Sequence, residues 1–132
     1  MARLHDITFD CRHPASLARF WAAVVDGYEV APYDDAELER LRNNGIDQPE
    51  DDPTVLVLPD HPGPRLFFQR VPEEKVVKNR VHLDLEADDP DAEIERLVGL
   101  GAIVLARRDE GDHRWVTLAD PEGNELCVET GR

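Results

Sequence analysis

The sequence predicts an α+β protein made of two similar modules that share a cleft. A strand, a helix opened by proline and a glycine stop occur at 4–27 and again at 81–101. Further along, D-H-P-G-P-R-L at 60–66 is matched by D-P-E-G-N-E-L at 120–126. Each module is then a strand, a helix and up to three strands. When a helix covers one face of a sheet, the other face is free to line a cavity.

The helices follow from their apolar spacing and their terminal residues. A helix that starts near Pro14 buries one stripe, formed by Leu17, Phe20, Trp21, Val24 and Val25. A second helix has Pro90 at its first position and Gly101 just after its end. A third is predicted from Asp35 to Asn43, because D-x-x-E from Asp34 to Glu37 is a capping signal.

Five short alternating segments predict strands, with proline–glycine or glutamate–glycine turns between several of them. They are Val55–Leu58, Arg65–Val71, Ile103–Ala106, Arg114–Leu118 and Glu125–Glu129. Residues 34–53 interrupt the first module and have no counterpart in the second. This insertion holds 8 acidic residues and 2 arginines, and we expect a lid or rim element there.

Length and charge bound the classes of function. The 132 residues suffice for one domain, 1–132, with module one at about 1–72 and module two at about 79–132. A net charge of −14 excludes a nucleic-acid partner and favours a cationic small ligand in a cleft. No apolar run is long enough to span a membrane, and no signal peptide is evident. Cys11 and Cys127 are expected to be thiols, although a disulfide stays open, so we expect a cytoplasmic protein.

Strand alternation predicts which side chains face the cleft, because successive residues point to opposite faces of a sheet. Apolar residues in each strand are assigned to the helix side, which leaves their neighbours open. The residues predicted to bind a ligand are Asp6, Thr8, Phe67, Gln69, His82, Asp84, Cys127 and Glu129. Trp115 is assigned either to a pocket wall or to the core. His5, His13, His61 and His113 are expected at solvent or turn positions.

The chain resembles bacterial glyoxalase-like domains of the vicinal oxygen chelate superfamily. The paired modules, Phe20-Trp21 in the first helix, and W-V-T-L-A-D-P-E-G-N-E-L at 115–126 carry the resemblance. It implies two tandem βαβββ modules whose curved sheets enclose a shared cleft, usually in a homodimer. Members of this superfamily include metal-dependent lyases, isomerases, epimerases and dioxygenases, and metal-free proteins that sequester antibiotics such as bleomycin.

The resemblance also implies four metal-ligand positions, which fall here on Asp6, Phe67, His82 and Cys127. Phenylalanine cannot bind a metal, so the usual set is not intact. A different set, Asp6, Gln69, His82 and Glu129, would share the same faces and could hold a divalent metal. The other interpretation of His82 is a hydrogen-bonded cavity residue, and that of Cys127 a small buried side chain.

Three functions remain open at this level. The first is a bleomycin-resistance-like protein that binds a small organic, cationic ligand in the cleft without metal. The second is a metal-dependent lyase, isomerase or dioxygenase. The third is an accessory module that docks a protein partner through the acidic insertion. No catalytic residue is assigned in any of them.

Overall fold

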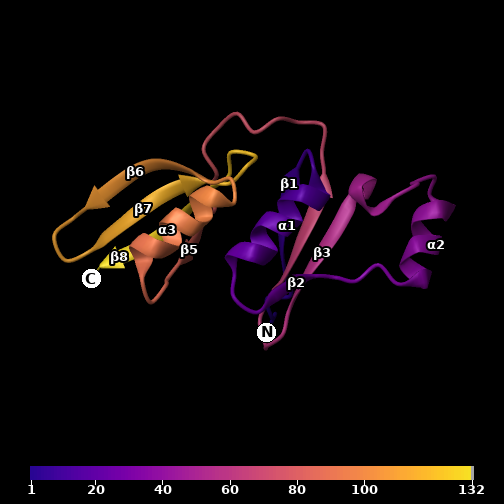
Figure 1. Ribbon diagram of the computed structural model, residues 1–132, viewed down its shortest axis with the longest axis horizontal. Coiled ribbons are helices and arrows are strands. Elements are labelled where there is room, and N and C mark those ends of the chain that lie inside the picture. The colour runs from indigo at the N-terminus through magenta and orange to yellow at the C-terminus, as the bar shows by residue number, and fades with distance from the viewer. Residues whose placement is uncertain (132) are drawn as a thin grey trace. The chain divides into compact units, whose positions relative to one another are not determined.

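The computed structural model describes residues 1–131, and the chain divides into two compact units. Unit 1 is Met1–Glu74, and unit 2 begins at Lys75. Each unit contains one four-stranded sheet with a helix packed on one face (Figure 1). No helix in the described chain is long and apolar enough to cross a bilayer.

Unit 1 contains four strands and two α-helices. In chain order they are β1 (Asp6–Cys11), α1 (Pro14–Val24), β2 (Tyr28–Val30), α2 (Asp35–Asn43), a 3-10 helix (Pro49–Asp51), β3 (Thr54–Pro59) and β4 (Arg65–Arg70). The sheet order is β1-β4-β3-β2, and β1 runs parallel to β4 while the other pairs are antiparallel.

Unit 2 repeats this topology without the insertion. Its elements are β5 (Leu83–Leu85), α3 (Pro90–Gly99), β6 (Ile103–Asp109), β7 (Arg114–Ala119) and β8 (Glu125–Gly131). The sheet order is β5-β8-β7-β6, again with one parallel pair, β5 and β8. The two tandem βαβββ modules expected from the sequence are therefore confirmed.

The strand registers fix which residues are equivalent in the two units. Ile7 pairs with Leu66 in unit 1, and Leu83 pairs with Leu126 in unit 2. Leu66 and Leu126 end the matching segments 60–66 and 120–126, so their partners Ile7 and Leu83 are equivalent. The residues just before these partners, Asp6 and His82, are then equivalent as well. His82 therefore occupies the position of Asp6.

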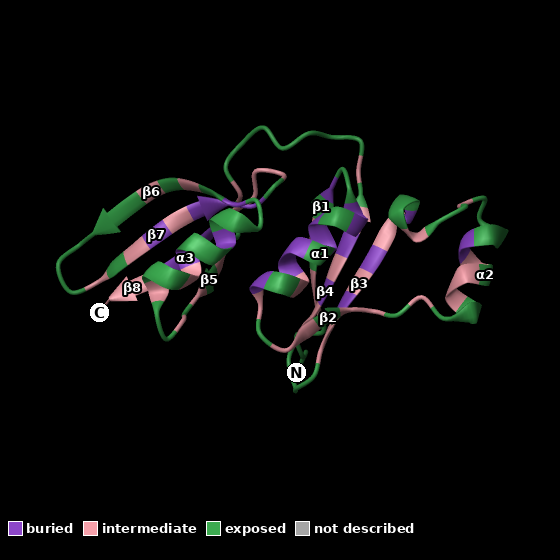
Figure 2. Ribbon diagram, viewed as in Figure 1, coloured by how far each residue is buried: buried purple, intermediate pink, exposed green. Residues whose placement is uncertain are grey.

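The two hydrophobic cores differ in kind. In unit 1 the Phe9 ring lies 4.9 Å from that of Trp21 and 4.8 Å from that of Phe68, measured between centroids. Trp21 and Phe68 are fully buried. Unit 2 is packed with aliphatic side chains from α3, β7 and β8: Ile94, Leu97, Val116, Leu118, Leu126 and Val128. Figure 2 shows buried residues along α1, β3 and β4 and exposed ones over much of β6.

The predicted helices are confirmed, and the main difference lies in the strands. The sequence missed β2, because three residues with one half-buried valine at the sheet edge carry too little alternation to predict a strand. The strand β6 extends to Asp109 rather than ending at Ala106, since Arg107, Arg108 and Asp109 pair with β7 despite their charge.

The acidic insertion is anchored to the rest of unit 1 by polar contacts. Asp52, 1% exposed, accepts hydrogen bonds from the Tyr33 hydroxyl at 2.8 Å, the Arg40 guanidinium at 3.2 Å and the Thr54 amide at 3.0 Å. Burial and the Asp52 carboxylate raise the pKa of Tyr33 well above its usual range. Arg19 on α1 binds both oxygens of Glu50.

Candidate functional site

The open face of the unit 2 sheet contains a hollow of about 350 Å³. Strands β5 to β8 and the segment before β5 supply its walls. The lining residues are Lys78, His82, Asp84, Arg108, His113, Trp115, Thr117, Glu125, Cys127 and Glu129. They combine an aromatic surface, a thiol, two imidazoles and charges of both signs.

The alternation of side chains along the strands places these residues on the open face of the sheet, as predicted from the sequence. On β8, Leu126 and Val128 are fully buried, while Glu125, Cys127 and Glu129 between and beside them line the hollow. Asp84 and Thr117 flank Cys127, because both are its register partners on the neighbouring strands. Four of the predicted ligand-binding residues, His82, Asp84, Cys127 and Glu129, therefore lie in one hollow.

Three of the lining residues converge more closely than the rest. The ligand atoms of His82, Asp84 and Cys127 all lie within 4.8 Å of one another. His82 Nε2 is 3.1 Å from Asp84 Oδ1, so the carboxylate orients the imidazole. His82 and Asp84 are exposed, whereas Cys127 is buried.

The Cys127 thiol is held in its protonated form. Burial raises its pKa, and the nearby charges of Asp84 and Glu129 raise it further. A hydrogen bond between the sulfur and the Thr117 hydroxyl, 3.3 Å apart, and the charge of Lys78 act in the opposite direction. Without a bound cation, this cysteine is therefore a poor nucleophile.

A histidine that sequence reasoning placed in a turn also lines the hollow. His113 Nε2 is 2.8 Å from Glu129 Oε2, and its ring centroid is 4.7 Å from that of Trp115. His113 lies in the turn just before β7, as expected from the sequence, yet it still follows the alternation of the strand. Its side chain therefore shares a face with Trp115, two residues on. Trp115 itself is half-buried in the hollow wall.

Glu125 closes another part of the wall. Its carboxylate accepts hydrogen bonds from Lys75 Nζ at 3.1 Å and from the Asn79 amide at 3.0 Å. Burial alone would raise the pKa of Glu125, but these bonds outweigh burial and hold it below its usual range. The segment that leads into β5 is thereby fixed to β8.

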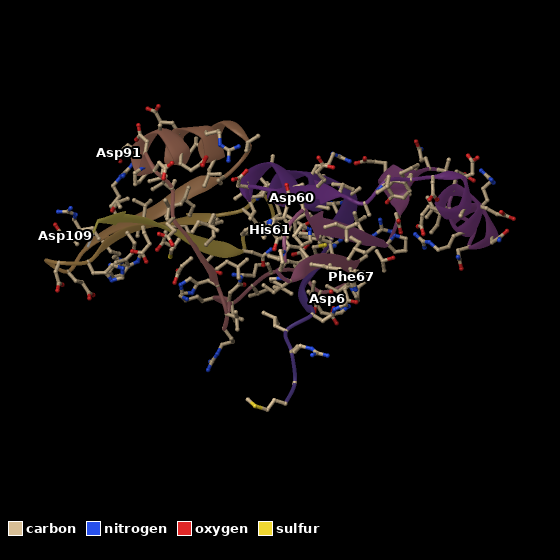
Figure 3. All side chains as sticks on the ribbon, turned by 90° about the horizontal axis from the view of Figure 1, so that it is seen from below. Asp6, Asp60, His61, Phe67, Asp91 and Asp109 are labelled. Atoms are coloured by element: carbon tan, nitrogen blue, oxygen red, sulfur yellow. The ribbon has the colours of Figure 1, made fainter. Side chains whose placement is uncertain are left out.

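The predicted residues of unit 1 lie on the open face of its own sheet. Asp6 and Phe67 lie near each other on β1 and β4 (Figure 3), where Thr8 is the register partner of Phe67. Arg65 donates to both oxygens of Asp6, at 2.7 and 3.0 Å, and this pairing lowers the pKa of Asp6. The Gln69 amide donates to Asp10 at 2.7 Å.

The metal candidates Asp6, Gln69, His82 and Glu129 are thus divided between the units. Asp6 and Gln69 are engaged with Arg65 and Asp10 in unit 1, and Glu129 with His113 in unit 2. Over residues 1–131, the donors that do converge are a nitrogen, an oxygen and a sulfur, from His82, Asp84 and Cys127. This donor set fits a borderline-soft divalent ion such as Zn²⁺, once the thiol is deprotonated.

Most of the D-P-E-G-N motif builds a turn rather than the hollow. Asp120, 1% exposed, accepts hydrogen bonds from the amides of Glu122 and Asn124, both at 2.9 Å. Gly123 has a φ of 91°, which favours glycine. This turn sets the start of β8 and hence the alternation of its side chains.

Comparison with known proteins agrees with this geometry. FosX, a fosfomycin resistance protein from Mesorhizobium loti, is 19% identical with a TM-score of 0.67, over 100% of this chain and 94% of that chain. A glyoxalase/bleomycin resistance protein/dioxygenase family enzyme from Burkholderia phytofirmans PsJN is 16% identical with a TM-score of 0.68, over 99% and 100%. TnmS3, an antibiotic binding protein from Streptomyces sp. CB03234, is 21% identical with a TM-score of 0.58, over 100% and 99%.

These solved structures share the fold, and their low identities carry no more than that. No curated protein matches the chain. Residues 6–129 match the family described as Glyoxalase-like domain. This range includes both modules and all the residues that line the hollow. The chain therefore belongs to the glyoxalase-like domain family of the vicinal oxygen chelate superfamily.

Proposed function

We propose that this protein binds a small organic molecule in the hollow of unit 2. The observation that carries the proposal is the hollow itself, with about 350 Å³ of space against one aromatic wall and several polar groups. Ligand sites in proteins commonly have this size and this mixture of lining residues. The sequence-based expectation of a metal-free, bleomycin-resistance-like binder is one form of this proposal.

The chemistry of the lining supports binding rather than covalent catalysis. The Cys127 thiol, whose pKa is raised, is a weak nucleophile, and His82 and His113 each have a carboxylate within hydrogen-bonding distance. A ligand could stack on Trp115 and hydrogen-bond to these groups without a chemical step. TnmS3, which shares the fold, is named as an antibiotic binding protein.

The test is a screen of small aromatic and amphipathic molecules by thermal shift, repeated with two matched variants. His82→Ala removes an imidazole from the hollow, whereas His61→Ala removes one that lies 2.9 Å from Asp60 on a turn of unit 1. We expect a hit to lose affinity about tenfold or more in His82→Ala and to keep it in His61→Ala. Equal affinity in all three proteins would remove the hollow as the binding site.

A second function, that of a metal-dependent enzyme, is favoured by one specific observation. The donor atoms of His82, Asp84 and Cys127 lie within 4.8 Å of one another and match the preferences of Zn²⁺. A divalent ion at this place would supply Lewis acidity to a ligand oxygen. The lyases, isomerases and dioxygenases of the superfamily are the reaction classes to screen.

Elemental analysis of protein purified without chelator or affinity tag separates the two functions. About one equivalent of metal, lost when His82 and Cys127 are both replaced by alanine, would support the enzyme. No metal after incubation with Zn, Ni, Mn and Fe would leave the metal-free binder. A matched double variant, His61→Ala with Cys11→Ala, controls for loss of imidazole and thiol elsewhere.

The proposal includes a cytoplasmic, homodimeric protein. The homodimer is implied by the family, and the cytoplasmic location is supported by two cysteines that carry hydrogen-bonded thiols. Light scattering coupled to size-exclusion chromatography measures the mass in solution. A mass of one chain across the micromolar range would contradict the homodimer.

A further inference from the structure

We infer that the ligand of the hollow is an aromatic acid, whose ring lies on Trp115 and whose anionic group is held by Arg108 and Lys78. This inference rests on the proposed function and specifies the class of ligand. It departs from the cationic ligand expected from composition, because the carboxylates of the hollow have partners and the cations do not.

Each carboxylate in the wall is already engaged by another group of unit 2. Asp84 lies 3.1 Å from His82 Nε2, and Glu129 lies 2.8 Å from His113 Nε2. Glu125 accepts from Lys75 Nζ at 3.1 Å and from the Asn79 amide. A cationic ligand would therefore compete with an existing partner for each of these carboxylates.

The two cations of the wall are in the opposite situation. Within the described part of unit 2, the side chains of Arg108 and Lys78 form no hydrogen bond or ion pair, although both line the hollow. Lys78 acts on the site only through its charge, which favours the thiolate form of Cys127. An arginine without an acceptor offers a planar fork of N–H donors that matches a carboxylate, phosphonate or sulfonate group.

The position of Arg108 links the anion site to an aromatic surface. Arg108 is the register partner of Trp115 across β6 and β7, so both side chains leave the sheet on the open face. On the other side of Trp115, the His113 ring lies at a centroid distance of 4.7 Å and an interplanar angle of 34°. A flat ring that stacks on Trp115 would bring its acidic substituent within reach of Arg108.

The strand β6 also provides a matched control for charge. Arg107 precedes Arg108 and is the register partner of Val116, which is buried on the helix side. Both arginines are exposed, but only Arg108 lines the hollow. Replacing either one by glutamine removes the same charge from the same strand. Any difference in binding between the two variants is therefore due to the face of the sheet on which the arginine lies.

The test compares two naphthalene probes of similar size and opposite charge, 2-naphthoate and 2-naphthylmethylammonium. Binding is followed by quenching of Trp115, since the other tryptophan, Trp21, is fully buried in unit 1. We expect 2-naphthoate to bind about tenfold more tightly than the ammonium probe. Arg108→Gln should weaken this preference, Arg108→Gln combined with Lys78→Gln should abolish it, and Arg107→Gln should keep it.

Two results would overturn the inference. One is an ammonium probe that binds as tightly as the acid, and the other is an acid preference that Arg108→Gln leaves unchanged or that survives the loss of both Arg108 and Lys78. In either case, weaker binding of the better probe by His82→Ala would show that the hollow still binds a ligand. If neither probe quenches Trp115, the aromatic acid is excluded, and the wider screen with His82→Ala and His61→Ala decides the proposed function separately.

Discussion

The two units share one topology and one register, yet their open faces have different chemistry. Asp6, Thr8 and Phe67 in unit 1 are equivalent to His82, Asp84 and Cys127 in unit 2. In unit 1 this part of the face is closed by the Asp6–Arg65 ion pair and carries a phenyl ring. In unit 2 the same three positions bring a nitrogen, an oxygen and a sulfur within 4.8 Å.

The comparison teaches that the repeated backbone determines where side chains point, whereas single residues decide what a face can do. Arg65 holds Asp6 in unit 1, but its equivalent in unit 2, Glu125, is turned toward Lys75 and Asn79. With no arginine in that place, His82, just before β5, pairs with Asp84 on β5 instead. The proposed ligand site is therefore built from unit 2 residues.

The largest expected effect separates the two cores. Phe68 and Val128 occupy equivalent positions, and both are fully buried. Phe68→Ala removes a ring stacked on Phe9 and should lower the free energy of unfolding by about 3–5 kcal/mol, against about 1–3 kcal/mol for Val128→Ala. Urea denaturation measures both values. Equal losses would mean that the aromatic cluster adds no more stability than aliphatic packing.

Most of the fold was predictable because the apolar positions follow a helical or a strand period throughout. The helix that starts at Pro14, the capped helix from Asp35 to Asn43 and the burial of Leu126 and Val128 follow from spacing alone. The short edge strand β2 was missed, since three residues do not establish a period.

The sequence predicted which face of the sheet the site residues lie on, but not which charged groups they pair with. Alternation placed His82, Asp84, Cys127 and Glu129 on one face, and all four line the hollow. Alternation does not show which opposite charge each carboxylate meets, because pairs such as Asp6 with Arg65 join residues 59 apart in the sequence. His113 was not among the predicted ligand-binding residues, because it lies in the turn just before β7, which begins at Arg114 as predicted.

A smaller effect is expected at the equivalent turns. Asp120 is buried and accepts amide hydrogen bonds from Glu122 and Asn124, whereas the Asp60 side chain is 77% exposed beside His61. Asp120→Ala should lower the free energy of unfolding by about 2–3 kcal/mol, because two amides lose their acceptor. Asp60→Ala should change it by about 0.5 kcal/mol or less. Thermal unfolding of both variants checks the contrast, and similar values would contradict it.

A change in reactivity rather than stability is expected at Cys127. Burial and the charge of Asp84 raise the pKa of this thiol, so Asp84→Asn should lower the pKa and speed alkylation about threefold or more at neutral pH. Mass spectrometry after iodoacetamide treatment measures the rate. Glu86→Gln removes a charge from the same segment outside the hollow and should leave the rate unchanged. Equal acceleration by both variants would reduce the effect to net charge.

The smallest effect compares how the two open faces respond to acid. The hydrogen bond from Arg65 lowers the pKa of Asp6 below its ordinary value of 3.8. A lowered carboxyl pKa stabilises the folded state fully above the ordinary value, and the contribution is lost as the pH falls through the lowered one. The difference in Tm between the parent and Arg65→Gln should therefore be constant at pH values well above 3.8 and shrink as the pH falls through the lowered pKa of Asp6.

In unit 2 the pKa of Glu125 is lowered as well. The hydrogen bond from the Asn79 amide lowers it more than the hydrogen bond from Lys75 does. Lys75→Gln should thus remove only part of the acid sensitivity that Glu125 contributes, whereas Arg65→Gln should remove nearly all of that due to Asp6. Both shifts should be small, because exposed ion pairs contribute little to stability. If Lys75→Gln flattened the pH dependence as much as Arg65→Gln, the backbone amide would have no separate role, and the two faces would respond to acid in the same way.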